Sequence, residues 1–328
     1  MKICAITMVR NEADVIESFI RYGLSHYDQM VVLDNGSTDN TPLILNKIIE
    51  EGKNIEVIHF PSSGKELGLF INELFSYAIK KYEPDFIVPI DADEFLEAKG
   101  NPRDVISTLS PKYVYIIPWR TYVPIVMPEY PEFVLKLMTH YRDIRYEKYT
   151  KVIIPTQLAK QYPLTINVGN HDVAGIDPTL VKTLNGVWMG HFPIRSQEQF
   201  RSKIIAGVVR HMCKIRHAGA GGHLLAPYER IKNGETVDLF SEAMNFANFT
   251  GKPFTLYYSA KFNTDFCSDT RLHYPELAQV SYLKNTLNMA EQMAHTLQSI
   301  YMQFPLEAAE DGEMSLRNLL KKRRPGQR

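Results

Sequence analysis

FIVPIDADEFLEAKG, residues 86–100, joins an apolar run to three closely spaced carboxylates. The apolar run predicts a buried strand over residues 86–91. Asp91 and Asp93 stand at its carboxyl end, and Glu94 follows directly. Burying carboxylates at such a place costs several kcal/mol per ion unless a cation meets them. We therefore expect a cation at this point of the fold.

Strand and helix patterns alternate along the chain up to this stretch. Strands are expected at residues 2–9, 30–34, 55–60 and 86–91, and helices at 11–24, 43–49 and 66–82. Thr41 and Pro42 are expected as the N-cap and the first residue of the second helix. Short connections between such elements imply right-handed crossovers, and hence a mostly parallel sheet with helices on both faces.

Three polar clusters follow strands of this predicted sheet, at Arg10–Glu12, Asp34–Asn35 and Asp91–Asp93. Carboxyl ends of parallel strands meet at one edge of the sheet, where ligands bind, so we expect the clusters to converge. The two aspartates of the last cluster suit Mg²⁺ or Mn²⁺, with nucleotide phosphates completing the shell. An aspartate that caps the next segment is the structural alternative. Asp34 and Asn35 are expected to face the cleft.

The composition excludes several classes of protein. The chain has 328 residues, 45% of them hydrophobic, with 37 Lys plus Arg against 37 Asp plus Glu, so no basic field indicates a nucleic-acid partner. Three distant cysteines without a CxxC pattern favour a reducing compartment. We predict a cytoplasmic protein, because no signal peptide or apolar span is visible. The basic residues 321–324 either contact an anionic membrane face or form a solvated terminus.

The second half of the chain has a different pattern. Irregular β structure and loops are expected at residues 112–133, strands at 150–155 and 164–173, and helices at 197–216 and 277–304. The glycine-rich residues 217–223 predict either a loop that orders over a bound ligand or a plain connector. The last helix is interpreted as a packing or oligomerising element.

Two quoted stretches carry a family resemblance. ITMVRNEADVIESFIRYGLSHYDQMVVLDNGSTDNT, residues 6–41, and PDFIVPIDADEF, residues 84–95, resemble family 2 glycosyltransferases with the glycosyltransferase A fold. HFPIRS, residues 191–196, is similar to a later segment of the bacterial branch with MVRNE and DNGSTD motifs. The resemblance implies an α/β, Rossmann-like fold with a mostly parallel central sheet flanked by helices and a C-terminal helical extension.

The resemblance also implies a division of the chain and an activity. Residues 1–100 would bind the nucleotide-sugar, residues 101–230 would form the acceptor side of the same domain, and residues 231–328 a mainly helical extension. The implied activity is metal-dependent transfer of a sugar, with inversion, from a nucleotide-sugar, usually a UDP-sugar, to a glycan or lipid-linked acceptor, as in polysaccharide biosynthesis.

Donor and metal contacts follow from the same resemblance. It implies donor contacts for Val9, Arg10, Asn11, Glu12, Asp34, Asn35, Asp91 and Ala92. Many relatives have aspartate where this chain has Asn35, which leaves the nucleobase open. Asp93 is expected to bind Mn²⁺ or Mg²⁺ directly, and Asp91 to contact the ribose or a metal-bound water. His191 is the expected further ligand of the metal.

Other roles rest on chemistry near these motifs. Arg195 and Lys203 would pair with phosphate oxygens, or else are solvated helix charges. An inverting transferase needs a general base, for which Asp172 and Glu94 are the candidates. Three aromatic residues and an arginine either belong to the acceptor region or are core residues: Trp119, Arg120, Tyr122 and Tyr130.

Two other functions stay open. A sugar nucleotidyltransferase also has a sheet with metal-binding carboxylates, but it generally carries a glycine-rich phosphate loop after its first strand. TMVRNEADVI, residues 7–16, has no glycine there. A nucleotide-sugar-binding protein without catalysis would keep Asp34 and Asp93 but lack a working base.

Overall fold

The computed structural model describes residues 1–60, 67–125, 130–137, 139–143, 147–212, 222–248, 253–258 and 262–303. The chain divides into two units, Met1–Leu287 and Asn288–Arg328. The second unit is described only for residues 288–303, which are the end of the helix α10 (Tyr282–Gln303). The basic residues 321–324 lie outside the described part of the chain, as does the predicted loop from 217 to 221.

Parallel strands form the N-terminal half of the central sheet. They are β1 (Ile3–Val9), β2 (Gln29–Asp34), β3 (Ile55–His59) and β4 (Phe86–Pro89). β1 lies between β2 and β4, and β3 pairs with the outer side of β2, all in parallel register. The predicted parallel pairing of these four strands is therefore confirmed in this half.

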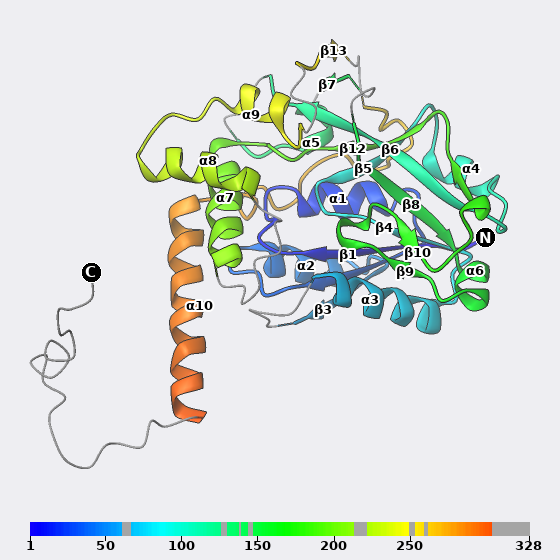
Figure 1. Ribbon diagram of the computed structural model, residues 1–328, viewed down its shortest axis with the longest axis horizontal. Coiled ribbons are helices and arrows are strands. Elements are labelled where there is room, and N and C mark those ends of the chain that lie inside the picture. Colours follow the sequence, from blue (N-terminus) through cyan, green and yellow to red (C-terminus); the bar gives the residue numbers. More distant parts are fainter. Residues whose placement is uncertain are drawn as a thin grey trace, which may run out of the picture. The chain divides into compact units, whose positions relative to one another are not determined.

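Helices cover both faces of these strands (Figure 1). They are α1 (Ile16–Gly23), α2 (Thr41–Glu50) and α3 (Leu67–Tyr82). Side chains alternate along a strand, so Ile3 and Ala5 of β1 pack in one core with α1 and α2. Cys4 and Ile6 pack in a second core with α3. The expected α/β fold with helices on both faces is confirmed.

Antiparallel strands extend the sheet beyond β4. They are β8 (Thr150–Pro155), β6 (Val114–Val123), β7 (His140–Arg142) and β13 (Leu256–Tyr258), in that order. β12 (Val187–His191) runs parallel to β6 and antiparallel to β5 (Glu94–Ala98). The expectation of irregular structure at residues 112–133 is wrong for β6, a continuous ten-residue strand. Its isoleucines, tyrosines and valines are strand formers that pack between both halves of the sheet.

Shorter elements connect these layers. They are α4 (Pro102–Ser107), α5 (Val134–Leu137), α6 (Thr156–Gln161), β9 (Thr165–Ile166), η2 (Val168–Asn170), β10 (Val173–Ala174), η3 (Pro178–Leu180), β11 (Val181–Thr183), α7 (Gln197–Met212), α8 (Gly222–Lys232) and α9 (Leu239–Asn245). None of the helices in the described ranges combines the length and apolar character of a membrane span.

Three further expectations need correction. Residues 164–173 do not form one strand, because Gly169 adopts φ +81° and the chain turns back, so that β9 and β10 pair antiparallel. Residues 222–223 begin α8 rather than a loop. Residues 231–287 are not mainly helical, since β13 joins the central sheet through β7. The division of the chain at residue 100 stays a prediction.

Candidate functional site

The ends of β1 and β2 meet, as their polar clusters predicted. The Asn35 backbone N–H donates to the Val9 carbonyl oxygen at 2.9 Å. The Asn11 side-chain oxygen accepts a hydrogen bond from the Thr38 backbone N–H at 2.7 Å. Asn11 has φ +56°, a left-handed conformation that asparagine tolerates better than most residues. These contacts bring the first two clusters to one edge of the sheet.

Thr41 does not act as the predicted N-cap. Asn40 is the N-cap of α2, and Asp39 accepts from the Thr41 backbone N–H at 2.9 Å. The Thr41 hydroxyl instead accepts from the Glu12 backbone N–H at 2.8 Å. This long-range bond holds residues 11–13 in an extended turn, so α1 begins at Ile16 and not at residue 11 as predicted.

Asp34 and Asn35 are more enclosed than expected. Asp34 is 4% exposed, and its carboxylate accepts from the Ser37 backbone N–H at 3.0 Å and lies 3.2 Å from His59 Nδ1. Asn35 is buried, and its side-chain oxygen has no hydrogen-bond partner in the described structure. Val9 and Ala92 are also buried. All four of these predicted donor contacts are therefore buried in the structure.

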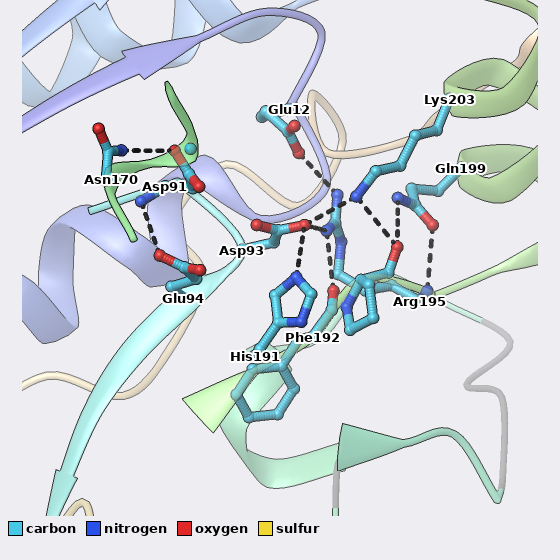
Figure 2. Close-up of polar contacts among 12 residues, drawn as sticks. Glu12, Asp91, Asp93, Glu94, Asn170, His191, Phe192, Arg195, Gln199 and Lys203 are labelled. Atoms are coloured by element: carbon cyan, nitrogen blue, oxygen red, sulfur yellow. Dashed lines mark hydrogen bonds and ion pairs between the residues drawn. The ribbon is translucent and has the colours of Figure 1, made fainter. Parts of the chain in front are cut away.

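Asp93 is the carboxylate around which nitrogen atoms gather (Figure 2). Its Oδ2 atom lies 2.8 Å from Lys203 Nζ, 3.7 Å from Arg195 Nη1 and 3.8 Å from His191 Nε2. Burial raises the pKa of Asp93, but the cations Lys203 and Arg195 outweigh burial and hold the pKa below its usual range. The carboxylate is therefore ionised, and the chain itself supplies the cations that its burial requires.

Arg195 joins two segments that are distant in the sequence (Figure 2). Its guanidinium donates to Asp14 Oδ2 and Glu12 Oε2, both at 2.7 Å, and to the Phe192 carbonyl oxygen at 3.1 Å. The Arg195 side chain is only 4% exposed. Burial raises the pKa of Glu12 to about 7, against the lowering effect of Arg195. Arg195 thus anchors residues 12–14, and Asp14 is a member of this cluster that the sequence motifs did not identify.

His191 ends β12 and is held by an aromatic ring. Its imidazole stacks on Trp119, with ring centroids 4.0 Å apart and an interplanar angle of 20°. Burial lowers the pKa of His191 well below its ordinary value, although Asp93 opposes this. The Nδ1 atom has no partner in the described structure. The ring is therefore neutral and can offer a nitrogen lone pair on the side of Asp93.

A second, deeper ionic cluster lies beneath Asp91. The Lys151 ammonium donates to Asp91 Oδ2 at 2.7 Å and to the Gly169 carbonyl oxygen at 2.6 Å, and lies 3.0 Å from Glu94 Oε2. Asn170 donates to the other Asp91 oxygen at 3.1 Å. Lys151 was not identified from the sequence. The signal was there: TKVIIP, residues 150–155, places a lysine inside an apolar strand pattern.

Glu94 has no access to an acceptor hydroxyl in this arrangement. It is fully buried, and Lys151 and the Asp91 backbone N–H contact its Oε2 atom. Burial raises the pKa of Glu94 to about 8, against the lowering effect of Lys151. A carboxyl group in these surroundings supports its neighbours, whereas a general base has to reach the substrate.

Asp172 follows the turn that contacts Lys151 and Asp91 through Gly169 and Asn170, but its own carboxylate has no ion pair within the described residues. Its side chain is exposed, and it accepts from the adjacent Val173 backbone N–H at 2.7 Å. The neighbouring His171 stacks on Tyr149 with centroids 4.3 Å apart. A Cβ atom on Gly169 would lie 2.6 Å from the His171 ring, so the turn that carries Asp172 needs glycine there.

The residues expected at the acceptor side divide by exposure. Tyr122 is fully buried, and its hydroxyl donates to Glu97 at 3.1 Å, so it is a core residue. Trp119 is 6% exposed beneath His191. Arg120 is buried, and its Nη1 atom lies 2.5 Å from Glu97 Oε1. Tyr130, in contrast, is 70% exposed. The four residues therefore do not form one surface.

Asp93 and His191 fit a divalent ion better than Asp91 does. Hard divalent ions bind oxygen at about 2.1 Å, so two atoms 3.8 Å apart can reach one ion. Both oxygens of Asp91 already accept hydrogen bonds. Within the described ranges, no three His, Cys, Asp or Glu side chains are grouped for a metal. The chain thus offers two ligands, and water or a bound phosphate would complete the shell.

Comparisons with known proteins give the following similarities. Residues 4–159 match the family described as "Glycosyl transferase family 2". No curated protein sequence matches the chain. Among solved structures, TarS from S. aureus has 18% sequence identity and a TM-score of 0.38, covering 77% of this chain and 76% of its own. A mannosyltransferase from Pyrobaculum calidifontis, in complex with GDP-Man and Mn²⁺, has 16% identity and a TM-score of 0.37, covering 75% and 70%.

A third solved structure is glucosyl-3-phosphoglycerate synthase from Mycobacterium tuberculosis, in complex with Mn²⁺, UDP and glucosyl-3-phosphoglycerate. It has 16% identity and a TM-score of 0.33, and covers 66% of this chain and 82% of its own. The family match includes β1, β2 and β4, the strands whose carboxyl ends carry the three polar clusters. On that match, residues 4–159 belong to glycosyl transferase family 2, and the chain is a glycosyltransferase.

Proposed function

We propose that this glycosyltransferase moves a sugar, with inversion, from a nucleotide-sugar to a glycan or lipid-linked acceptor, and that it uses Mn²⁺ or Mg²⁺. The observation that carries the proposal is the cluster around Asp93. A carboxylate, a neutral imidazole and two cations meet there, at the carboxyl edge of the parallel strands. Such an edge is where open α/β sheets bind nucleotides.

The donor would lie along the ends of β1, β2 and β4. Residues 9–12 and Asn35 would contact the base and ribose, and the unpartnered Asn35 oxygen would accept one hydrogen bond from the base. The Asp91 side chain is 42% exposed, while Lys151 and Asn170 orient both of its oxygens. Asp91 is therefore our candidate for the ribose hydroxyls. A UDP-sugar is the first donor to test.

Asp93 and His191 would hold the divalent ion, which when bound would stabilise the negative charge on the departing diphosphate. The chain supplies cations for the same charge. Lys203 is 35% exposed on α7, so its ammonium can turn from Asp93 to a phosphate oxygen. Arg195 is enclosed by Glu12 and Asp14, and would position Glu12 and Asp93 instead of contacting phosphate as predicted.

Asp172 is our candidate for the general base, because Glu94 is enclosed against Lys151. An exposed carboxylate on a glycine-dependent turn can approach an acceptor hydroxyl on the face opposite the leaving group. Asp172→Asn should retain donor binding and lose transfer. Unchanged transfer in that variant would move the role to a residue other than Asp172.

The deciding experiment needs no knowledge of the acceptor. UDP with Mn²⁺ should raise the melting temperature, and EDTA should remove the increase. Slow metal-dependent hydrolysis of one nucleotide-sugar in a panel should then identify the donor. No thermal shift with any nucleoside diphosphate would refute the donor site. A shift without hydrolysis of any donor would favour the alternative, a nucleotide-sugar-binding protein without catalysis.

A further inference from the structure

A cavity lies against β5, β6 and β12, the strand that ends at His191. Its volume is about 660 Å³. Its lining includes Glu97 of β5 and the following Lys99, Arg120 of β6, Trp188 of β12, and Phe262 and Asp265 from the segment that begins at residue 262. The volume lies within the range of about 300–1,000 Å³ that is usual for small-molecule sites.

The cavity opens on the opposite face of these strands from the Asp93 cluster. Side chains alternate along β12, so Trp188 points away from the face that carries His191. The strand pairing agrees, since Trp188 pairs with Glu97 and His191 pairs with Glu94. Trp188 and His191 are three positions apart along β12, as are Glu97 and Glu94 along β5. This odd spacing again places the two pairs on opposite faces. This cavity therefore does not belong to the donor site described above.

A stack of side chains forms the wall of the cavity. The Arg120 guanidinium carbon lies 3.8 Å from the centre of the Trp188 ring and 4.4 Å from that of Tyr141. Arg120 Nη1 donates to Glu97 Oε1 at 2.5 Å, and the Tyr122 hydroxyl donates to the other oxygen of this carboxylate at 3.1 Å. The buried Arg120 Nε atom has no partner in the described structure. Trp188, itself partly exposed, is thus held in one orientation.

Phe262 forms another wall because β12 carries glycine at its contact. A Cβ atom on Gly190 would lie 2.7 Å from the Phe262 ring. Phe262 is buried, and next to it the Asp265 carboxylate lines the cavity. The Asn263 amide also lines it, but it already donates to the Lys99 carbonyl oxygen and accepts from the Asp265 backbone N–H, both at 3.1 Å. The wall therefore combines an indole and a phenyl ring with donors and acceptors of hydrogen bonds.

The charges at the cavity balance. Lys99 and Arg120 carry positive charge, whereas Glu97 and Asp265 carry negative charge. A nucleotide or another polyanion would gain nothing from this set. A neutral sugar has an apolar ring face, which suits an aromatic side chain, and hydroxyl groups that both donate and accept. We infer that this cavity binds a neutral saccharide, at a site separate from the one that holds the donor.

The two tryptophans of the chain, Trp119 and Trp188, allow a direct test. In Trp119→Phe, all tryptophan fluorescence comes from Trp188, at the cavity. The probes are maltohexaose, cellohexaose and N-acetylchitohexaose, with UDP as the anionic comparison. We expect at least one saccharide to protect Trp188 from acrylamide quenching in a saturable way, and UDP to leave quenching unchanged.

Asp265→Ala tests whether the effect comes from this cavity. Asp265 is exposed, so the variant should fold, and loss of its hydrogen bond should weaken saccharide binding by about 5-fold. If Trp119→Phe does not fold, saturation-transfer NMR compares the unmodified chain with Trp188→Leu, which should lose the saccharide signal. Failure of all three saccharides to bind, or equal binding by Asp265→Ala and Trp188→Leu, would overturn the inference. Neither readout depends on sugar transfer.

Discussion

Two aspartates separated by one residue are each paired with a lysine, and the two lysines differ in exposure. Lys151, which contacts Asp91, is 0% exposed, whereas Lys203, which contacts Asp93, is 35% exposed. Asp91, Glu94 and the Gly169 carbonyl oxygen use all three ammonium protons of Lys151. Lys203 contacts Asp93 and, at 3.3 Å, the Pro193 carbonyl oxygen.

The difference separates a permanent ion pair from one that can be exchanged. Lys151 is fully buried, so Asp91 has to meet its charge in every state of the folded chain, while Glu94 and the Gly169 carbonyl oxygen complete its contacts. Lys203 can leave Asp93 without being desolvated, because part of its side chain already contacts water. The first pair therefore supports the fold, and the second belongs to the site where charge changes during sugar transfer.

Asp93→Asn removes the carboxylate of the exchangeable ion pair with Lys203, and we expect the largest effect from it. Turnover should fall by at least about 10³-fold, since the site loses the charge that positions cations at the diphosphate. The free energy of unfolding should fall by less than in Lys151→Met, because Arg195 keeps Glu12 and Asp14 and Lys203 already contacts water. Donor turnover and urea denaturation measure both. Asp177→Asn, an exposed aspartate outside the site, is the control. Turnover near that of the control would remove Asp93 from the mechanism.

Lys151→Met removes the cation of the permanent ion pair with Asp91. Asp91 and Glu94 would lose their buried cation, and the free energy of unfolding should fall by about 3–5 kcal/mol. Lys160→Met, at an exposed position on α6, is the matched control and should change little. Adding Glu94→Gln to Lys151→Met should change stability little further near pH 7, because the raised pKa already keeps Glu94 largely protonated. A loss below about 1 kcal/mol would show that Lys151 is not the structural partner that its burial indicates.

Lys203→Met sharpens the comparison, since it should affect binding and not stability. UDP affinity should fall by about 10-fold, as expected for one charged hydrogen bond to phosphate. Mn²⁺ affinity without nucleotide should not fall, because Asp93 Oδ2 loses a competing ammonium. Calorimetric titration with UDP, and electron paramagnetic resonance for Mn²⁺, measure the two separately. Unchanged UDP affinity would assign Lys203 to the helix surface.

Glu94→Gln should have the smallest effect of the four variants near pH 7, and it tests the buried cluster through pH. The pKa of Glu94 is raised to about 8, whereas that of an unfolded glutamate is about 4.3. Between these values the folded state binds more protons than the unfolded state. Stability should therefore fall as pH rises from about 5 to 8, by at most about 1.4 kcal/mol per pH unit. The variant should have a flatter profile in chemical denaturation. The same slope in both proteins would contradict the raised pKa.

Local patterns in the sequence were sufficient for the parallel half of the fold. Apolar runs of strand length predicted β1 to β4, and the polar residues directly after them predicted an edge where Val9, Asn11 and Asn35 do come together. Asp93 and His191 were also brought together as expected. Their roles in binding a metal and the donor stay predictions.

Other parts of the site depend on partners that no local pattern indicates. Arg195 meets Asp14 across 181 positions of the sequence, and Lys151 meets Asp91 across 60. Which carboxylate a buried cation contacts follows from strand order and register. Thr41 shows the same limit, because its hydroxyl binds Glu12 on another segment and not its own helix.

The sequence by itself determined the alternating strands and helices, the edge at which they present polar residues, and the family of the N-terminal part. These follow from the period of apolar residues and from motifs that are continuous in the chain. Only the tertiary structure decided that Asp93 meets an exchangeable cation, Lys203, while Glu94, the next residue, is enclosed. Burial and ionisation depend on what surrounds a group in space, and here the surroundings come from β8, β12 and α7, far along the chain.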